Sequence, residues 1–405
     1  MGSINKLLVS IYLGNELIEV GELVSSNRRI HFKYHSQFLE KGINISPIKL
    51  PLTKGIHTGE VAPFDGLFGV FNDSLPDGWG RLLLDRKLIS QGVSLNDVSP
   101  LDRLAYVGKN GKGALIYTPD FSDSVTDKAM VDLSYIANEV AEVIEGASSE
   151  IIDKLFTMGG ASGGARPKIF IGYNPLSGDL IYGAEELPEG YEAWMIKFPS
   201  SLDPKDIANI EFAYHKMAVE AGLEMMDCKL FEGKDGRQFF GTKRFDRDVN
   251  KRYHTTTAAG LLHDNFRLTN IDYGHIMWAA FEISKSVIER EKVLRLAAFN
   301  VFSENRDDHS NNFSFIMSPS GAWKFAPVYD LTYSSSSHGE HSILVAGEGK
   351  NPTKEHLLKL ANNFDIKTGA KIIEEVRIAV NNWKIFAKEA GVSRFEMNRI
   401  FKNIG

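Results

Sequence analysis

The sequence contains a single cysteine, Cys228, among 405 residues. One cysteine excludes an intramolecular disulfide framework and fits a reducing compartment, so we expect a cytoplasmic protein. Long apolar runs and a charged-then-apolar secretory leader are also missing, which predicts no membrane association. Positive charge is not in excess, since 46 Lys and Arg stand against 52 Asp and Glu, a net charge of −6. The whole chain is therefore not an electrostatic DNA binder, and its His and Cys positions lack zinc-ligand spacing.

The composition, 43% hydrophobic and 24% charged, is that of a globular protein, and 405 residues predict two or three packed units. Residues 1–120 are typical of short strands and turns with some helix. Residues 121–150 predict a polar loop and a helix, and residues 151–247 a small-residue loop and several strands. Residues 248–405 have mainly helical periodicity, and the sequence has no internal repeat.

Local patterns predict individual elements. Leu7–Leu13 and Ile30–Tyr34 favour strands, and Gly14-Asn15 favours a tight turn after the first of them. Apolar periodicity predicts helices over 81–88, 136–144, 287–302, 372–390 and 394–401.

The most informative stretch is Asn305–Phe313, in which Asp307 precedes Asn312 by five residues. A second carboxylate, Asp330, follows Asn312 by eighteen residues. Phosphoryl transfer from ATP uses one carboxylate to orient the attacking hydroxyl, and an Asn and an Asp to hold Mg²⁺ on the phosphates. Protein kinases have the same Asp-to-Asn offset in their catalytic loop. Such a spacing is common by chance, so it indicates a kinase only if the rest of a nucleotide site is present elsewhere in the chain.

A small-residue run, Thr157–Lys168, is one candidate for that site, and an apolar strand pattern follows it directly. Its glycines allow backbone N–H groups to approach an anion, and Lys168 adds a compact positive charge. The run matches neither the Walker nor the GxGxxG pattern, so a plain flexible turn is the alternative.

Lys197 lies in the apolar strand pattern Trp194–Pro199, and Glu211 opens a helical pattern fourteen residues later. Such a lysine is either a solvent-facing edge residue or a buried phosphate ligand. Kinases pair a strand lysine with a helix glutamate to position the α- and β-phosphates. Each element alone is more often structural, but the small-residue loop, Lys197, Glu211 and the Asp307 stretch occur in kinase order.

Taken together, these motifs resemble the HipA-like serine/threonine kinases, toxins of bacterial type II toxin–antitoxin modules. The resemblance runs nearly end to end. Its N-terminal part rests on Val20–Leu23, Ser46–Leu52, Phe71–Gly78 and Gly108–Leu115. Its C-terminal part rests on Gly163–Lys168, Ile196–Pro199, Glu211, Lys243–Arg247, Asp307–Ser314 and Ala326–Leu331.

The resemblance implies an α+β, two-lobed protein-kinase-like fold. Residues 1–120 would be the N-terminal accessory α/β subdomain and residues 121–150 a connecting loop and helix. Residues 151–247 would be the N-lobe-like region with the glycine-rich loop and hinge, and residues 248–405 the mainly helical C-lobe with the catalytic and metal-binding loops.

The resemblance also implies residue roles. Asp307 would be the catalytic carboxylate, Asn312 and Asp330 would ligate Mg²⁺, and Lys197 would hold the ATP phosphates. The other residues expected to line the ATP site are Gly163, Gly164, Ala165, Arg166, Pro167, Lys168, Glu211, Lys243, Arg244, Phe245, His309 and Tyr329.

Three positions depart from the family pattern. Family members can phosphorylate a serine in the small-residue loop, and Ser162 is the candidate here, but its offset from Lys168 is unusual and a plain turn serine is the alternative. Asn311 stands where a lysine is frequent, which affects substrate-side charge contacts. Lys243 stands where an acidic residue can occur, so adenine contacts there are expected through the backbone.

The implied activity is ATP- and Mg²⁺-dependent phosphorylation of a protein serine or threonine, in a translation factor or an aminoacyl-tRNA synthetase. A HipB-like helix-turn-helix antitoxin is the implied partner, with DNA contacted only through it. Two alternatives stay open: a small-molecule or lipid kinase on the same fold, and a non-catalytic corepressor. The corepressor is disfavoured because it would be expected to lose Asp307, Asn312, Lys197 or Asp330, and all four are present.

Overall fold

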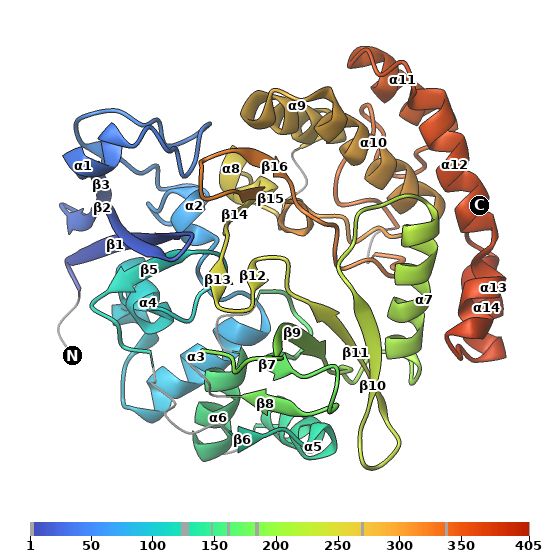
Figure 1. The fold of residues 1–405 in the computed structure, drawn as a ribbon, viewed down its shortest axis with the longest axis horizontal. Helices are drawn as coiled ribbons and strands as arrows, with labels where there is room; N and C mark the ends of the chain where they lie inside the picture. The colour runs from blue at the N-terminus through green and yellow to red at the C-terminus, as the bar shows by residue number, and fades with distance from the viewer. Residues whose placement is uncertain are drawn as a thin grey trace. The chain divides into compact units, whose positions relative to one another are not determined.

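The computed structural model describes residues 4–122, 129–146, 149–159, 163–182, 186–268, 271–336 and 339–404 (Figure 1). The chain divides into two compact units. Unit 1 comprises Met1–Asp203, Leu230–Thr255 and Met317–Gly321, and unit 2 comprises Pro204–Lys229, Thr256–Ile316 and Ala322–Gly405. Unit 1 mixes sheets and helices, and unit 2 is mainly helical, so the predicted α+β class is confirmed.

The N-terminal sheet of unit 1 has five strands in the order β4-β3-β2-β1-β5. The predicted strands and turn are confirmed, because Leu13 pairs with Glu16 across a two-residue turn in which Gly14 has φ +65°. The strands are β1 (Lys6–Leu13), β2 (Glu16–Ser26), β3 (Arg29–Tyr34), β4 (His57–Thr58) and β5 (Leu115–Thr118).

A second sheet has six strands in the order β10-β11-β9-β7-β8-β6. Its strands are β6 (Ala129–Met130), β7 (Lys168–Tyr173), β8 (Leu180–Tyr182), β9 (Glu192–Lys197), β10 (Cys228–Glu232) and β11 (Gln238–Lys243), and a hairpin of β12 (Arg247–Asp248) and β13 (Lys251–Arg252) follows. The helices of unit 1 are α1 (Ser36–Glu40), α2 (Gly69–Asn72), α3 (Trp79–Ser90), η1 (Leu95–Asp97), α4 (Pro100–Val107), α5 (Leu133–Ile144) and α6 (Ser149–Gly159).

One face of the six-stranded sheet packs against α3, α5 and α6. Ile169 and Ile171 of β7 and Trp194 and Ile196 of β9 belong to the hydrophobic core that these helices complete. Because side chains alternate along a strand, the residues between them point to the opposite face. Lys168 of β7 and Lys197 of β9 therefore lie on the face of the sheet that is turned away from these helices.

Unit 2 is mainly helical, and two predicted helices have the predicted bounds, Val287–Phe302 and Arg394–Phe401. The helices are α7 (Ile207–Glu220), α8 (Ala258–Leu262), α9 (Tyr273–Ser284), α10 (Val287–Phe302), η2 (Ser310–Asn312), α11 (Lys354–Asn363), α12 (Gly369–Asn381), α13 (Trp383–Glu389) and α14 (Arg394–Phe401). A three-stranded sheet, most of whose residues belong to unit 2, has the order β14 (His254–Thr257), β15 (Ser314–Met317) and β16 (Trp323–Phe325).

The single helix predicted over 372–390 is wrong, because the structure has two helices that meet at Asn382. Asparagine side chains compete for backbone hydrogen bonds and favour helix ends. Trp383 is fully buried, and its indole N–H donates to the carbonyl of Met397 at 3.0 Å. Packing against the last helix thus outweighs the continuous helical pattern.

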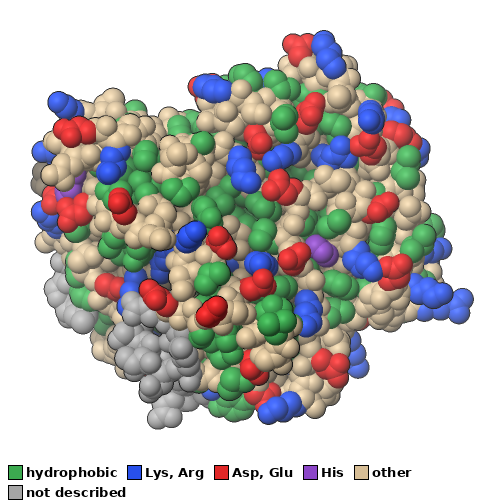
Figure 2. Space-filling model, in the orientation of Figure 1, with side chains coloured by type: hydrophobic (Ala, Val, Ile, Leu, Met, Phe, Trp, Pro, Cys, Tyr) green, Lys and Arg blue, Asp and Glu red, His purple; other side chains and the backbone are tan. Residues whose placement is uncertain are grey.

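No helix in the described ranges is both long and apolar enough to cross a bilayer. Basic and acidic side chains are interspersed over the face displayed in Figure 2. Mixed charge of this kind is typical of an ordinary solvated surface.

Candidate active site

In the loop Asp307–Asn312 of unit 2, Asp307 is exposed and His309 half-buried, whereas Asp308 and Ser310 are buried. The side chain of Asp307 is 65% exposed, whereas that of its neighbour Asp308 is fully buried. A carboxylate in water can receive a substrate proton, and a buried one needs several hydrogen-bond donors to offset its desolvation. Adjacent aspartates thus have opposite environments, which suits one to chemistry and the other to holding the loop.

Three donors surround the Asp308 carboxylate. It accepts hydrogen bonds from the Tyr273 hydroxyl at 2.7 Å, the His341 Nδ1–H at 3.0 Å and the Ser342 backbone N–H at 2.8 Å. Burial, together with the Asp308 charge, raises the pKa of Tyr273 well above its ordinary value, so the phenol keeps its proton and donates. The network extends through Asn300, whose amide donates to the Tyr273 hydroxyl at 2.9 Å. Asp308 therefore ties the loop to α9, α10 and the segment around residue 341.

A second anchor holds the other end of the loop. The buried Ser310 hydroxyl donates to the Asp264 carboxylate at 2.6 Å. Burial raises the pKa of Asp264, and the hydrogen bond from Ser310 opposes that rise. With Asp308 and Ser310 both fixed, the residues beside them have little freedom to move.

The two predicted metal ligands lie on segments joined by Tyr329. The Tyr329 hydroxyl donates to the Asn311 carbonyl at 2.6 Å, next to Asn312 in the chain. The Asn312 amide N–H donates to the Asp307 backbone carbonyl at 2.7 Å, which orients the amide and leaves its oxygen as a possible ligand. Asp330 has φ +60°, an uncommon backbone conformation that is enriched where function demands it.

An amide oxygen and a carboxylate suit Mg²⁺, which is a hard cation usually bound through one or two protein oxygens plus phosphate and water. His309 lies beside them, with its ring centroid 5.3 Å from that of Phe266 and its Nε2 3.9 Å from Asp307. Within the described residues, the buried His309 Nδ1 has no hydrogen-bond partner. Buried polar atoms are usually hydrogen-bonded, so this nitrogen is suited to receive a hydrogen-bond partner from a bound ligand.

In unit 1, the small-residue loop leads into β7. Gly164 has φ +86°, and its carbonyl accepts a hydrogen bond from the Trp79 backbone N–H at 3.0 Å. The Lys168 ammonium donates to the Gly163 carbonyl at 2.5 Å. Arg166 pairs with Asp203 at 2.8 Å, and the Pro167 carbonyl accepts from the Phe198 N–H at 2.9 Å. Ala165 is exposed within this turn, while Ser162 lies outside the described residues.

Lys168 and Lys197 are directly opposite each other on β7 and β9. They are 6% and 7% exposed, and β9 is interior to the sheet, so the solvent-facing edge reading of Lys197 is wrong. The Lys197 ammonium lies 5.5 Å from the centroid of the Phe240 ring. Two ammonium groups at opposite positions concentrate positive charge on this face of the sheet, and an anion bound there would be attracted to both.

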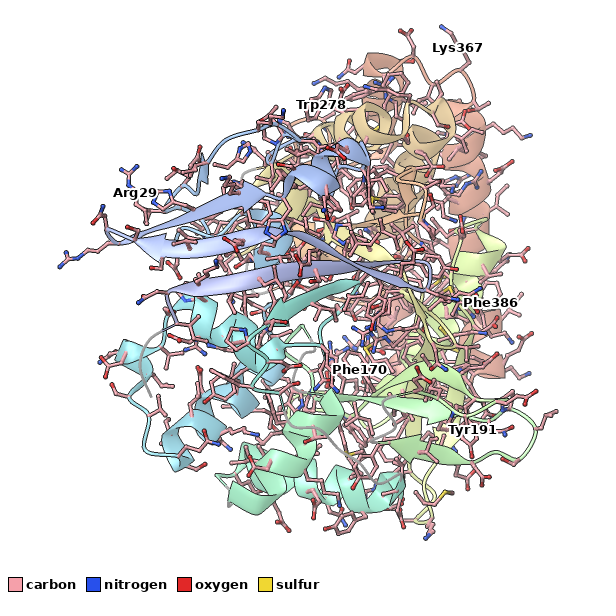
Figure 3. The ribbon with its side chains drawn as sticks, turned by 60° about the vertical axis from the view of Figure 1, so that its left-hand side comes forward. Arg29, Phe170, Tyr191, Trp278, Lys367 and Phe386 are labelled. Atoms are coloured by element: carbon pink, nitrogen blue, oxygen red, sulfur yellow. The ribbon has the colours of Figure 1, made fainter. Side chains whose placement is uncertain are left out.

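The predicted hinge residues have different environments. Lys243 pairs with Glu192 at 2.7 Å, on the face opposite to Lys197. Burial alone would raise the pKa of Glu192, but hydrogen bonds from Lys243 and Trp194 outweigh it and lower that pKa. The Arg244 guanidinium lies 4.1 Å from the centroid of the Phe170 ring, which is labelled in Figure 3. Phe245 follows, half-buried.

Glu211 is 3% exposed within α7, and its pairing with Lys197 stays a prediction. Unit 1 brings together Gly163–Lys168, Lys197 and Arg244 around one sheet face. Unit 2 brings together Asp307, His309, Asn312 and Tyr329, with Asp330 next to Tyr329 in the chain.

Sequence reasoning missed several residues of these sites. Asp308 and Asp264 anchor the loop Asp307–Asn312, and Phe170 and Phe240 lie on the sheet face of Lys168 and Lys197. For Phe170 a signal existed, because it stands two residues after Lys168 in a strand and therefore points to the same side. Asp264 is remote in sequence, and only the folded chain brings it to Ser310.

Family models match over residues 160–383, described as HipA-like C-terminal domain, and over residues 9–118, described as HipA N-terminal domain. No curated relative matches the sequence significantly.

Two solved structures are similar. One is a chain of the Shewanella oneidensis MR-1 toxin–antitoxin complex of HipA, HipB and operator DNA, with 16% identity and a TM-score of 0.70, covering 98% of this chain and 96% of that one. The other is the Helicobacter pylori proinflammatory kinase CtkA, with 14% identity and a TM-score of 0.35, covering 53% of this chain and 88% of that one. The first match shows that the fold is shared along nearly the whole chain.

Proposed function

Because the chain belongs to the HipA-like family, we propose that it is an ATP- and Mg²⁺-dependent serine/threonine protein kinase. The observation that carries the proposal is the hydrogen bond from the Asn312 amide to the Asp307 backbone carbonyl. It joins a solvent-exposed carboxylate and a potential metal ligand on one rigid loop, as phosphoryl transfer requires.

Each residue of the site would have a separate role in phosphate transfer. Asp307 accepts or orients the proton of the substrate hydroxyl, since its side chain is 65% exposed and can be reached by a substrate. Asn312 and Asp330 hold Mg²⁺, which when bound neutralises the phosphate charge. Lys168 and Lys197, with the Gly163–Gly164 turn, hold the phosphates. Catalysis then rests on positioning and electrostatic stabilisation.

The biological setting is proposed on the family resemblance. The substrate would be a translation component such as an aminoacyl-tRNA synthetase, and the protein would act in the cytoplasm. The solved complex of HipA with HipB and operator DNA supports a HipB-like antitoxin as partner, through which DNA would be contacted. Autophosphorylation at Ser162 belongs to the same proposal.

The test is transfer of radioactive phosphate from ATP to protein in a cell lysate, with Mg²⁺ present. Asp307→Asn should abolish labelling of protein and leave ATP affinity largely intact, because this carboxylate faces the acceptor. Asp330→Asn should weaken Mg·ATP binding as well, because it removes a charged metal ligand. Label that appears in metabolites or lipids would favour the rival kinase class, and wild-type labelling by Asp307→Asn would refute the role of Asp307.

A further inference from the structure

The loop Lys109–Gly113 belongs to the N-terminal part of the chain but is held by the segment that follows β11. Arg247 donates to the carbonyls of Gly111 at 2.9 Å and Gly113 at 2.8 Å. Arg252 donates to the Lys109 carbonyl at 2.7 Å. Three carbonyls within five residues are thus fixed by two guanidinium groups, which makes this loop a rigid platform.

A buried aspartate completes the platform. Asp246 accepts the Gly113 N–H at 2.8 Å and is bridged to Arg244 and Arg247, both at 2.8 Å. Burial alone would raise the pKa of Asp246, but the two arginine charges outweigh it and hold the pKa well below its ordinary value. The carboxylate therefore stays ionised and keeps both arginines in place.

This platform presents Lys112 to the small-residue loop. The Lys112 ammonium lies 3.1 Å from the position that a Cβ atom on Gly163 would occupy. The Lys168 ammonium lies 2.7 Å from the corresponding position on Gly164 and contacts the Gly163 carbonyl. Two positive charges from distant parts of the sequence therefore converge on one turn of two glycines, and all of these residues belong to unit 1.

Among the described residues, Lys112 takes part in no ion pair, and it is half-buried. Lysine in such a place acts as a point charge for phosphate, and a glycine turn lets the backbone approach the same anion. A carboxylate ligand would instead favour a planar bidentate arginine, and the arginines nearby are occupied by Asp246 and backbone carbonyls.

We propose that Lys112, together with Lys168, binds a phosphate group of the nucleotide at the Gly163–Gly164 turn. The inference rests on the proposed kinase function and extends it, because it makes the N-terminal part of the chain a wall of the nucleotide site. Deleting or displacing that part would then weaken nucleotide binding directly.

The experiment is calorimetric titration of the full chain with ATP, ADP and pyrophosphate in the presence of Mg²⁺. Lys112→Ala should weaken ATP binding about tenfold or more, which corresponds to about 1.4 kcal/mol. Lys112→Arg should restore most of the affinity because it keeps the charge. Lys54→Ala removes the same charge from an exposed position in unit 1 and should bind as wild type does. Thermal unfolding of each variant checks folding, and Lys112→Gln serves as a second variant if alanine perturbs the loop.

Each outcome decides something. A loss for ATP but not ADP supports contact with the γ-phosphate, and a loss for both supports contact with a phosphate nearer the ribose. Unchanged ATP affinity in a folded Lys112→Ala or Lys112→Gln variant overturns the proposal while leaving the kinase function standing. If wild type binds no nucleotide, the kinase proposal fails, and pyrophosphate binding that depends on Lys112 would still support the anion site. Wild type that binds neither ligand overturns both.

Discussion

Asp307 and Asp308 are adjacent in the chain and differ in environment, so the same substitution should affect thermal stability at only one of the two positions. Asp308→Asn replaces a carboxylate that accepts three hydrogen bonds with an amide that has one acceptor oxygen. At least one donor, from Tyr273, His341 or Ser342, then loses its partner inside the protein. Asp307→Asn changes an exposed side chain and leaves the packing untouched.

The expected magnitude follows from these contacts. A hydrogen bond to a charged group contributes about 1.5–3 kcal/mol, so losing one and weakening another should cost about 3 kcal/mol of the free energy of unfolding. For a unit of this size, that corresponds to a fall in Tm of about 6–12 °C. Asp307→Asn should change the free energy of unfolding by less than about 0.5 kcal/mol, as exposed substitutions usually do.

The assay combines thermal unfolding with phosphate transfer for both variants. Asp308→Asn should lower Tm and also lower the transfer rate, because the loop that holds Asp307 loses its anchor. Asp307→Asn should keep Tm and lose transfer. An Asp308→Asn protein with wild-type Tm would show that the buried network contributes little, and an Asp307→Asn protein with a large fall in Tm would show that Asp307 is structural.

Two further predictions concern unit 1. His254 is buried and donates through Nε2 to the Ile45 carbonyl, and burial lowers its pKa to about 4. The unfolded chain has an ordinary histidine pKa of about 6.5, so it binds the proton at a higher pH than the folded chain does. The free energy of unfolding therefore keeps its full value above about pH 6.5 and falls by up to about 3 kcal/mol as the pH drops towards 4. His254→Gln, which keeps a donor but does not titrate, should flatten that part of the curve of urea-unfolding free energy against pH; an unchanged slope would contradict the assignment. Gly78 has φ +49°, and a Cβ there would lie 2.3 Å from the Gly164 carbonyl oxygen. Gly78→Ala should therefore displace the small-residue loop and weaken ATP binding about tenfold, measured by calorimetry. Gly92→Ala, with φ +75° and open space around its Cβ, is the matched control and should keep wild-type affinity.

Much of the fold follows from local patterns. The bounds of α10 and the β1–β2 turn agree with the periodicity of apolar residues and with the preference of glycine for positive φ. The helix break at Asn382 does not follow from periodicity, because burial of Trp383 against α14 decides it. The helix propensity of a residue contributes only a small free energy, and burial of an aromatic side chain contributes more.

The order and spacing of Asp307, Asn312, Asp330 and Lys197 indicated a phosphotransfer chemistry, and the further motifs along the chain indicated a family, since all of these are properties of the sequence. Only the tertiary structure decided which of two adjacent aspartates is exposed, that Lys168 is opposite Lys197, and that Lys112 approaches Gly163. The reason is physical: exposure, strand register and the convergence of charges depend on contacts between residues far apart in the chain, whose free energies no local pattern records.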